Sequence, residues 1–128
     1  YQVPKLPEWL LSRNDMSNMV DSLEITSNPG TFDDETIDRY KSAWEHTGIE
    51  PRINWYRGFR RSESPPRDTV TQPTLICWGE DDIALLPSMA EKSTDYCENG
   101  QVRTFPDASH WVHHERDGVT EALLQHLA

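Results

Sequence analysis

The sequence lacks the features that would direct the chain to a membrane or to nucleic acid. No apolar run in these residues approaches the roughly 20 that a membrane-spanning helix needs, and we expect no signal peptide in them. Basic residues are scarce, because Lys and Arg total 12 against 22 Asp and Glu, which gives a formal net charge of −10. Nucleic-acid binding requires clustered cations that neutralise phosphates. We therefore expect a soluble, cytoplasmic protein that has neither a membrane nor a nucleic acid as its partner.

Lysine and cysteine are both rare. The three lysines are Lys5, Lys41 and Lys92, and the two cysteines are Cys77 and Cys97. An acidic, lysine-poor surface is typical of a halophilic protein from a high-salt cytoplasm, where hydrated carboxylates keep the chain soluble. An ordinary acidic cytosolic protein is the alternative. The two cysteines form neither a zinc-ligand pattern nor a dense disulfide framework.

Helical patterns with little strand signal mark residues 1–68, which we expect to form a helical cap or lid and a connector. A first helix opens with Pro7 in its first turn, and its apolar face comprises Trp9, Leu10, Met16 and Met19. Another helix, over residues 51–61, is expected to place three apolar side chains on one side: Ile53, Tyr56 and Phe59. A polar connector follows at residues 62–68, where adjacent prolines prevent the helix from continuing.

Between these two helices, the helix expected over residues 33–47 has the clearest boundaries. Asp33 or Thr31 can cap its N-terminus, because a side-chain oxygen there accepts a hydrogen bond from an unpaired backbone amide. Acidic residues fill the first turn, where they interact favourably with the helix dipole. Gly48 is expected to end the helix.

Residues 69–128 have the alternating strand and helix pattern of a parallel α/β sheet. An almost wholly apolar run at residues 73–78 predicts a strand buried on both faces, and a second strand is expected at residues 101–105. Helices are expected for about ten residues from Pro87 and over residues 118–127, the latter with Val119, Leu123 and Leu127 facing inward. Because two strands cannot close such a core, we expect further strands to precede this chain in a longer protein.

Two candidate catalytic residues follow the carboxyl ends of these strands, where the active sites of open α/β sheets form. Asp82 comes just after the first strand, and His110 comes just after the second, 28 positions later. A carboxylate in this position can hold the Nδ1 proton of an imidazole, so that the ring acts as a general base. Asp81 is the nearest rival for the acid role.

Further histidines follow at His113 and His114, so a metal site has to be weighed. Zinc enzymes with a His-Glu-x-x-His motif place two ligands one helical turn apart, with a general base between them. The run from His110 to Glu115 lacks that arrangement. We therefore expect no metal, and we expect His113, His114 and Glu115 to begin the last helix.

Four motifs resemble segments of α/β-hydrolases of the epoxide hydrolase and haloalkane dehalogenase branch, and they follow the family's order. Residues 78–82, W-G-E-D-D, resemble the segment that holds the charge-relay acid, and residues 106–111, P-D-A-S-H-W, resemble the segment around the catalytic histidine. Residues 54–57, N-W-Y-R, are similar to a motif of epoxide hydrolase caps, and residues 1–4, Y-Q-V-P, resemble the piece that opens the cap. The order of acid before histidine also agrees.

The resemblance implies an α/β-hydrolase fold, with a helical cap at residues 1–68 and the C-terminal part of the core at residues 69–128. It implies that Asp82 is the charge-relay acid, that His110 is the base, and that Tyr56 hydrogen-bonds the epoxide oxygen. The implied reaction converts a small hydrophobic epoxide to a vicinal diol through a covalent ester with an upstream Asp. Neither a metal nor an organic cofactor is implied.

This sequence also departs from the family. Its 128 residues contain neither the nucleophile elbow nor the H-G-x-P oxyanion segment, so we expect the chain alone to be inactive. Arg116 and Asp117 stand where a proline is common, which we expect to alter only the start of the last helix. A haloalkane or haloacid dehalogenase, a Ser esterase, and a noncatalytic α/β-hydrolase-like fragment remain alternatives. The oligomeric state is left open.

Overall fold

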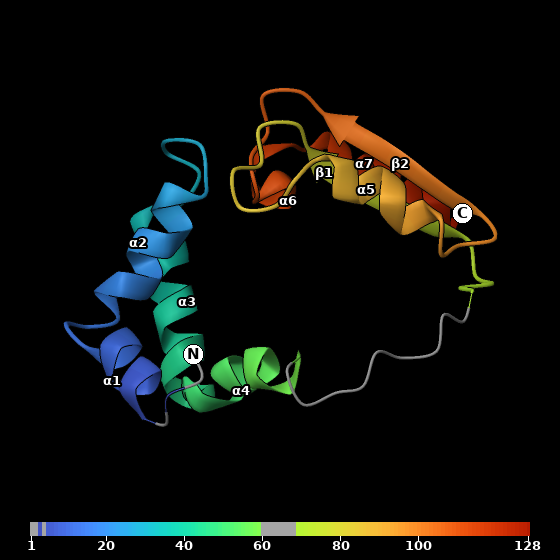
Figure 1. The fold of residues 1–128 in the computed structure, drawn as a ribbon. Coiled ribbons are helices and arrows are strands. Elements are labelled where there is room, and N and C mark those ends of the chain that lie inside the picture. The colour runs from blue at the N-terminus through green and yellow to red at the C-terminus, as the bar shows by residue number, and fades with distance from the viewer. Residues whose placement is uncertain (1–2, 4, 60–68) are drawn as a thin grey trace. The chain divides into compact units, whose positions relative to one another are not determined.

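The computed structural model of the chain describes residues 3, 5–59 and 69–128. The chain forms two compact units, drawn as ribbons in Figure 1. The helical unit comprises Tyr1–Ile25 and Phe32–Pro65, and the strand-containing unit comprises Thr26–Thr31 and Pro66–Ala128. The expected connector at residues 62–68 lies outside the described part. The assignment of residues 1–68 to a cap and of residues 69–128 to a hydrolase core stays a prediction.

Four helices are described in the helical unit (Figure 1): α1 (Leu6–Ser12), α2 (Ser17–Ile25), α3 (Asp34–Thr47) and α4 (Glu50–Phe59). The expectation of one helix with an apolar face from Trp9 to Met19 was wrong, because a turn separates α1 from α2. Asn14, Asp15 and Met16 have φ angles of 48°, 56° and 59° in this turn. Asn and Asp enter the left-handed region more readily than most residues, which explains where the helix breaks.

Helix α3 has the predicted boundaries, and the structure identifies Asp33 as its cap. The Asp33 carboxylate accepts a hydrogen bond from the Thr36 amide at 2.8 Å. At the other end, Gly48 has a φ of 74°, and its amide donates to the Trp44 carbonyl. The left-handed conformation at this point is one that glycine adopts without steric cost, so both ends of α3 follow from local chemistry.

The core of the helical unit contains the apolar side chains of Met16, Leu23, Trp44 and Ile53. Ile53 is 1% exposed, whereas Tyr56, three residues further along the same helix, is 53% exposed, so only part of the expected apolar side of the helix is buried. The side chain of Phe59 lies outside the described part. An ion pair between Arg57 and Glu8, 2.6 Å apart, joins α4 to α1. Helix α4 therefore contacts the rest of the helical unit through Ile53 and Arg57, and Tyr56 stays exposed.

The strand-containing unit has two described strands, β1 (Thr74–Gly79) and β2 (Gly100–Phe105), which pair in parallel with Gly79 opposite Phe105. The parallel pairing confirms the predicted sheet type. Helix α5 (Ser88–Thr94) lies in the crossover between the strands and is shorter than the expected ten residues. Strand β1 is only partly buried up to Gly79, although its apolar sequence predicted burial on both faces. Its burial is incomplete because the described sheet has just two strands to cover it.

Two further helices follow β2, namely α6 (Val112–Glu115) and α7 (Gly118–Leu127). The expectation that His113 and His114 begin the last helix was wrong, because extended backbone at Arg116 separates α6 from α7. Helix α7 has the predicted bounds, and Val119 is buried as expected. Leu123 and Leu127 are 44% and 80% exposed, so their predicted inward orientation was wrong.

The core of the strand-containing unit is a small cluster around α7 and the end of β2. It comprises Phe105, Ala108, Val112, Val119 and Ala122, with Leu75 and Cys77 of β1 packed against it. Most of these side chains are small, so the loop after β2 lies close to the sheet. This packing fixes the loop that contains His110.

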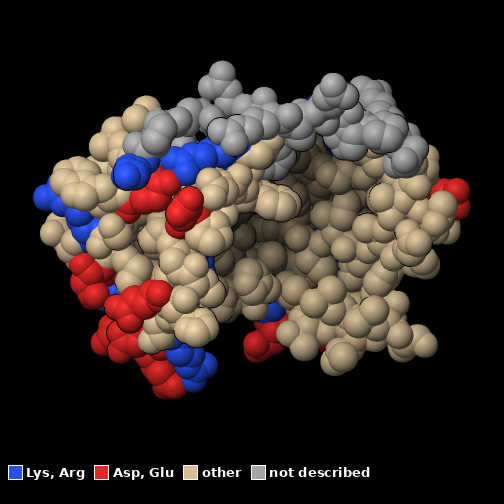
Figure 2. All heavy atoms as spheres, turned by 90° about the horizontal axis from the view of Figure 1, so that it is seen from below, with Lys and Arg blue, Asp and Glu red and all other residues tan. Residues whose placement is uncertain are grey.

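Figure 2 shows acidic and basic side chains gathered on the helical unit. The part of the strand-containing unit visible there is mostly uncharged. No helix in the described ranges is long and apolar enough to cross a membrane.

Candidate active site

The structure brings together the two residues that the sequence placed after the strands. Asp82 lies in the turn after β1 and His110 in the loop after β2, with 3.0 Å between Asp82 Oδ2 and His110 Nδ1. The Asp82 side chain is 6% exposed and that of His110 is 32% exposed. Asp81, the rival acid, is exposed, and its amide donates to the Ala108 carbonyl at 2.9 Å. Of the two carboxylates, Asp82 is therefore the one that contacts the imidazole.

The hydrogen bonds of Asp82 keep its carboxylate ionised. Burial by itself would raise the pKa of Asp82, but hydrogen bonds from His110 and from the amides of Leu85 and Ala84 outweigh burial and lower it. The two amides donate to Oδ1 at 2.9 Å and 2.8 Å. An ionised carboxylate can only accept, so the proton of a neutral His110 ring lies on Nδ1. Nε2 of His110 then has a free lone pair, as a general base requires.

Backbone contacts beyond the paired strands hold the two loops together. The Glu80 amide donates to the Phe105 carbonyl at 3.1 Å, one step past the end of β1. A Cβ atom at Gly79 would lie 2.1 Å from the Ser109 carbonyl oxygen and 2.4 Å from that of Ala108. Only glycine permits so close an approach, because any side chain would overlap backbone atoms. Gly79 was not singled out from the sequence, although a glycine between a strand and the acid is a usable signal.

The sequence did not predict a hydrogen-bond network that joins the His110 loop to residues Thr26–Thr31. Glu115 accepts from the Ser109 amide at 2.6 Å and from the Asn28 amide at 2.9 Å. The Trp111 ring donates from Nε1 to the Thr26 hydroxyl at 2.8 Å. Residues Thr26–Thr31 therefore help to hold the His110 loop, although they precede it by about 80 positions. No sequence pattern pairs such distant polar residues.

Tyr56, the third predicted site residue, lies on α4 in the helical unit. Its neighbour Arg57 is bonded to Glu8 and, at 3.1 Å, to Asn54, so the segment that carries Tyr56 is tied to α1. Asp82 and His110 belong to the strand-containing unit. The participation of Tyr56 in the site stays a prediction.

The other histidines of this region lie on α6, beside the Trp111 ring. His113 and His114 are both exposed, and their ring centroids are 4.5 Å apart. Burial, His114 and His110 together lower the pKa of His113. In the part of the chain that the structure describes, no three His, Cys, Asp or Glu side chains form a group suited to a metal ion.

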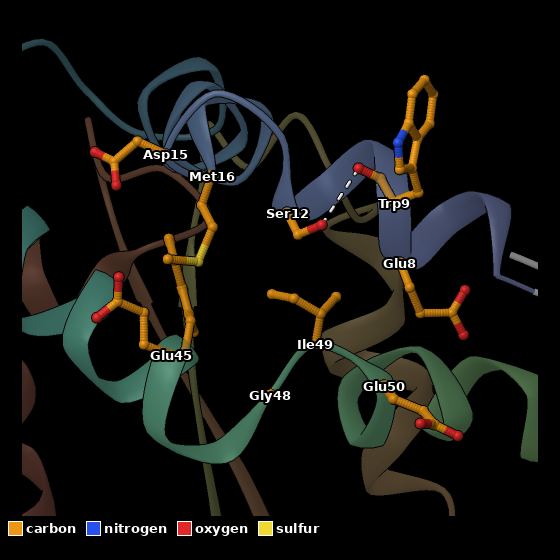
Figure 3. Close-up of a pocket in the computed structure, with 10 residues that line it drawn as sticks. Glu8, Trp9, Ser12, Asp15, Met16, Glu45, Gly48, Ile49 and Glu50 are labelled. Carbon is orange, nitrogen blue, oxygen red and sulfur yellow. Dashed lines mark hydrogen bonds between the residues drawn. The ribbon is translucent and has the colours of Figure 1, made fainter.

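A pocket of about 550 Å³ lies within the helical unit. Figure 3 shows Met16, Ser12 and Ile49 around it, with the carboxylates of Asp15 and Glu45 at one side. Its lining includes no histidine. The pocket is therefore not built around an acid and base pair of the kind formed by Asp82 and His110.

The parallel strands and the acid and histidine at their carboxyl ends define a fold class that comparison with known proteins also supports. The chain belongs to the alpha/beta hydrolase fold family, whose family model matches residues 3–117. It is 32% identical to the AB hydrolase superfamily protein YfhM of Bacillus subtilis, over 97% of this chain and 44% of that protein. It is 28% identical to epoxide hydrolase 2 of Caenorhabditis elegans, over 98% of this chain and 37% of that protein.

Solved structures agree on the fold. A crystal structure of Bacillus megaterium epoxide hydrolase in complex with an inhibitor matches with a TM-score of 0.77 at 21% identity, over 98% of this chain and 48% of that one. The predicted α/β-hydrolase fold and the resemblance to epoxide hydrolases are thus confirmed. The chain spans less than half the length of each of these proteins.

Proposed function

We propose that this chain forms the cap and the C-terminal core of an epoxide hydrolase in which Asp82 and His110 are the acid and the base. The observation that carries the proposal is the 3.0 Å contact between these side chains on loops after neighbouring parallel strands. Relatives called epoxide hydrolases in nematode, mouse and human, at 26–28% identity, support this choice among hydrolases. The nucleophile is proposed to be an Asp outside these 128 residues.

In the first step, the carboxylate of that Asp attacks one carbon of a small hydrophobic epoxide, and the ring C–O bond breaks. Tyr56 donates its phenolic proton to the departing oxygen, so that the intermediate is a hydroxyalkyl ester and Tyr56 is left as a phenolate. The cap motif N-W-Y-R at residues 54–57 supports this role. No metal or organic cofactor enters the step.

In the second step, Nε2 of His110 takes a proton from a water molecule, whose oxygen attacks the carbonyl carbon of the ester. Asp82 stabilises the imidazolium, because its carboxylate is ionised and accepts the Nδ1 proton. The ester bond breaks, the His110 imidazolium gives its proton to the leaving alkoxide oxygen, and the vicinal diol leaves. Hydrolysis of the ester yields one net proton, which returns to the Tyr56 phenolate and restores the starting state.

The test uses the longer enzyme, with styrene oxide as the substrate. His110→Ala is expected to accumulate the alkyl ester, which mass spectrometry detects as an adduct on the protein, because the base for ester hydrolysis is gone. His46→Ala, at an exposed position on α3, is the matched control and should turn over normally. A His110→Ala enzyme that turns over at the wild-type rate would contradict the proposal.

Tyr56→Phe is expected to slow formation of the ester in single-turnover measurements, because it removes the proton donor. Tyr96→Phe, at another exposed tyrosine, is the control. Halide release from haloalkanes in place of diol formation would identify a dehalogenase, and a Ser nucleophile would identify an esterase. The 128-residue chain alone should form no diol, and diol formation by it would contradict the placement of the nucleophile outside the chain.

A further inference from the structure

The carboxylate of Glu115 is the centre of a hydrogen-bond network that joins two distant parts of the chain. Its Oε2 accepts from the Ser109 amide at 2.6 Å and from Asn28 Nδ2 at 3.1 Å. Its Oε1 accepts from the Asn28 amide at 2.9 Å, from the Thr31 hydroxyl at 3.2 Å and from the Ser109 hydroxyl. A carboxylate offers about four lone-pair sites, so the accepting capacity of Glu115 is filled.

The donors to Glu115 are neutral amides and hydroxyls. Among the described residues, its carboxylate forms no ion pair with Lys or Arg, and Arg116 donates instead to the Glu115 backbone carbonyl at 2.9 Å. Burial would raise the pKa of Glu115, but the hydrogen bonds from Ser109, Asn28 and Thr31 lower it overall. The groups around Glu115 therefore suit an ionised carboxylate, which only accepts hydrogen bonds. A glutamine side chain at this position would point its NH2 group at groups that are themselves donors.

Through Ser109, this network acts on the residue next to the proposed base. The Ser109 amide and hydroxyl are held by Glu115, and its carbonyl lies against Gly79. Ser109 is itself buried, with 6% of its surface exposed. Because His110 follows directly, a shift of Ser109 would move the imidazole relative to Asp82.

We propose that Glu115 is a positioning residue for His110. We call the hydrogen bonds that hold the Glu115 carboxylate the clamp, and Thr26–Thr31 supplies those that do not come from Ser109. The role rests on the proposed function of His110 as the base that hydrolyses the ester. A displacement of about 1 Å of a catalytic group can cost on the order of a hundredfold in rate. Loss of the clamp should therefore slow the second step of the reaction and leave the first step intact.

The experiment compares Glu115→Gln with Glu121→Gln, a change of the same size at an exposed glutamate of α7, in the longer enzyme. Glu115→Gln is expected to form the ester at the wild-type rate and to hydrolyse it about ten- to a hundredfold more slowly, so that the ester accumulates. Glu121→Gln should behave as wild type. Rates are expressed per active site, counted from the burst of ester formation. Ester hydrolysis by Glu115→Gln at the wild-type rate per active site would overturn the proposal.

Two further variants separate positioning from stability. Ser109→Ala removes only the hydroxyl and should slow ester hydrolysis several-fold, which keeps the test open if Glu115→Gln does not fold. Asn28→Ala loosens the clamp without altering Ser109 and should have a smaller effect on the same step. If Ser109→Ala leaves ester hydrolysis unchanged, or if Asn28→Ala slows it more than Ser109→Ala does, the proposal fails.

A readout that does not depend on activity distinguishes this proposal from the proposed function. In the longer enzyme, the NMR signal of the His110 Nδ1 proton reports its hydrogen bond to Asp82. Glu115→Gln should shift or broaden this signal, and Glu121→Gln should leave it in place. An unchanged signal overturns the positioning role. Absence of diol formation by the wild-type longer enzyme, with the signal still sensitive to Glu115, overturns only the function.

Discussion

At the scale of single residues, the candidate site depends on a glycine, which has no side chain, as much as on Asp82 and His110. Gly79 lets the turn with Asp82 approach the backbone of Ala108 and Ser109 more closely than any Cβ atom would permit. Glu115 holds the same loop from the other side. The geometry of Asp82 and His110 is therefore set by neighbours that perform no chemistry.

Gly79→Ala is expected to destabilise the chain by about 1–3 kcal/mol, because the new methyl group would meet a backbone oxygen that cannot rotate away. Gly58→Ala is the matched control. It lies on α4 with nothing within 4 Å of an added Cβ, and the better helix propensity of alanine predicts a gain of up to about 1 kcal/mol. Urea unfolding of both variants measures the difference. Equal stabilities would contradict the close approach at Gly79.

The residues of the candidate site differ in how far the sequence could predict them. Asp82 and His110 each follow a short predicted strand, and this local signal was sufficient to place them at the same edge of the sheet. The sequence favoured Asp82 over its neighbour Asp81, and the structure places Asp82 Oδ2 against His110 Nδ1. Asn28 and Glu115 are separated by 87 positions, and no local pattern connects them.

At the scale of elements, the spacing of apolar residues predicted where helices form more accurately than it predicted which face of each helix is buried. The bounds of α3 follow from the Asp33 cap and from Gly48, and α7 begins and ends at the predicted residues. Helix α7 buries Val119 and Ala122, and Leu123, Leu124 and Leu127 are exposed. Hydrophobicity was a poor guide here because the two described strands cover only a narrow stripe of the helix.

Val119→Ala and Leu124→Ala test which side of α7 is buried in the 128-residue chain. Val119 is 3% exposed, so its truncation leaves a small cavity and should cost on the order of 1–3 kcal/mol. Leu124 is 65% exposed, and its truncation should change stability by less than about 0.5 kcal/mol. Unfolding midpoints in urea give both values. A larger loss from Leu124→Ala would mean that the opposite face is buried.

At the scale of the whole molecule, the net charge of −10 acts on both units. Like charges repel in the folded chain, and salt at about 1 M reduces the screening length to about 3 Å. Raising NaCl from about 0.05 M to about 1 M at pH 7 should therefore raise the melting temperature, by about 4–8 °C for each kcal/mol of repulsion removed. Tryptophan fluorescence during heating measures the shift.

The control for this effect is the same salt series near the isoelectric point of about 4.8, where the net charge is close to zero. The rise in melting temperature should shrink there if it comes from screening of net charge. An equal rise at both pH values would indicate that salt acts through exclusion from the surface. In that case the acidic composition would not explain the salt response.

The sequence by itself determined the kind of fold and indicated a candidate acid and base, because strand and helix patterns and the residues after each strand are local properties of the chain. The tertiary structure alone decided how closely Gly79 approaches the histidine loop, and that Thr26–Thr31 is hydrogen-bonded to Glu115. These features are contacts between residues far apart in the chain. Their energies depend on distance and burial in the folded state, which no local pattern encodes.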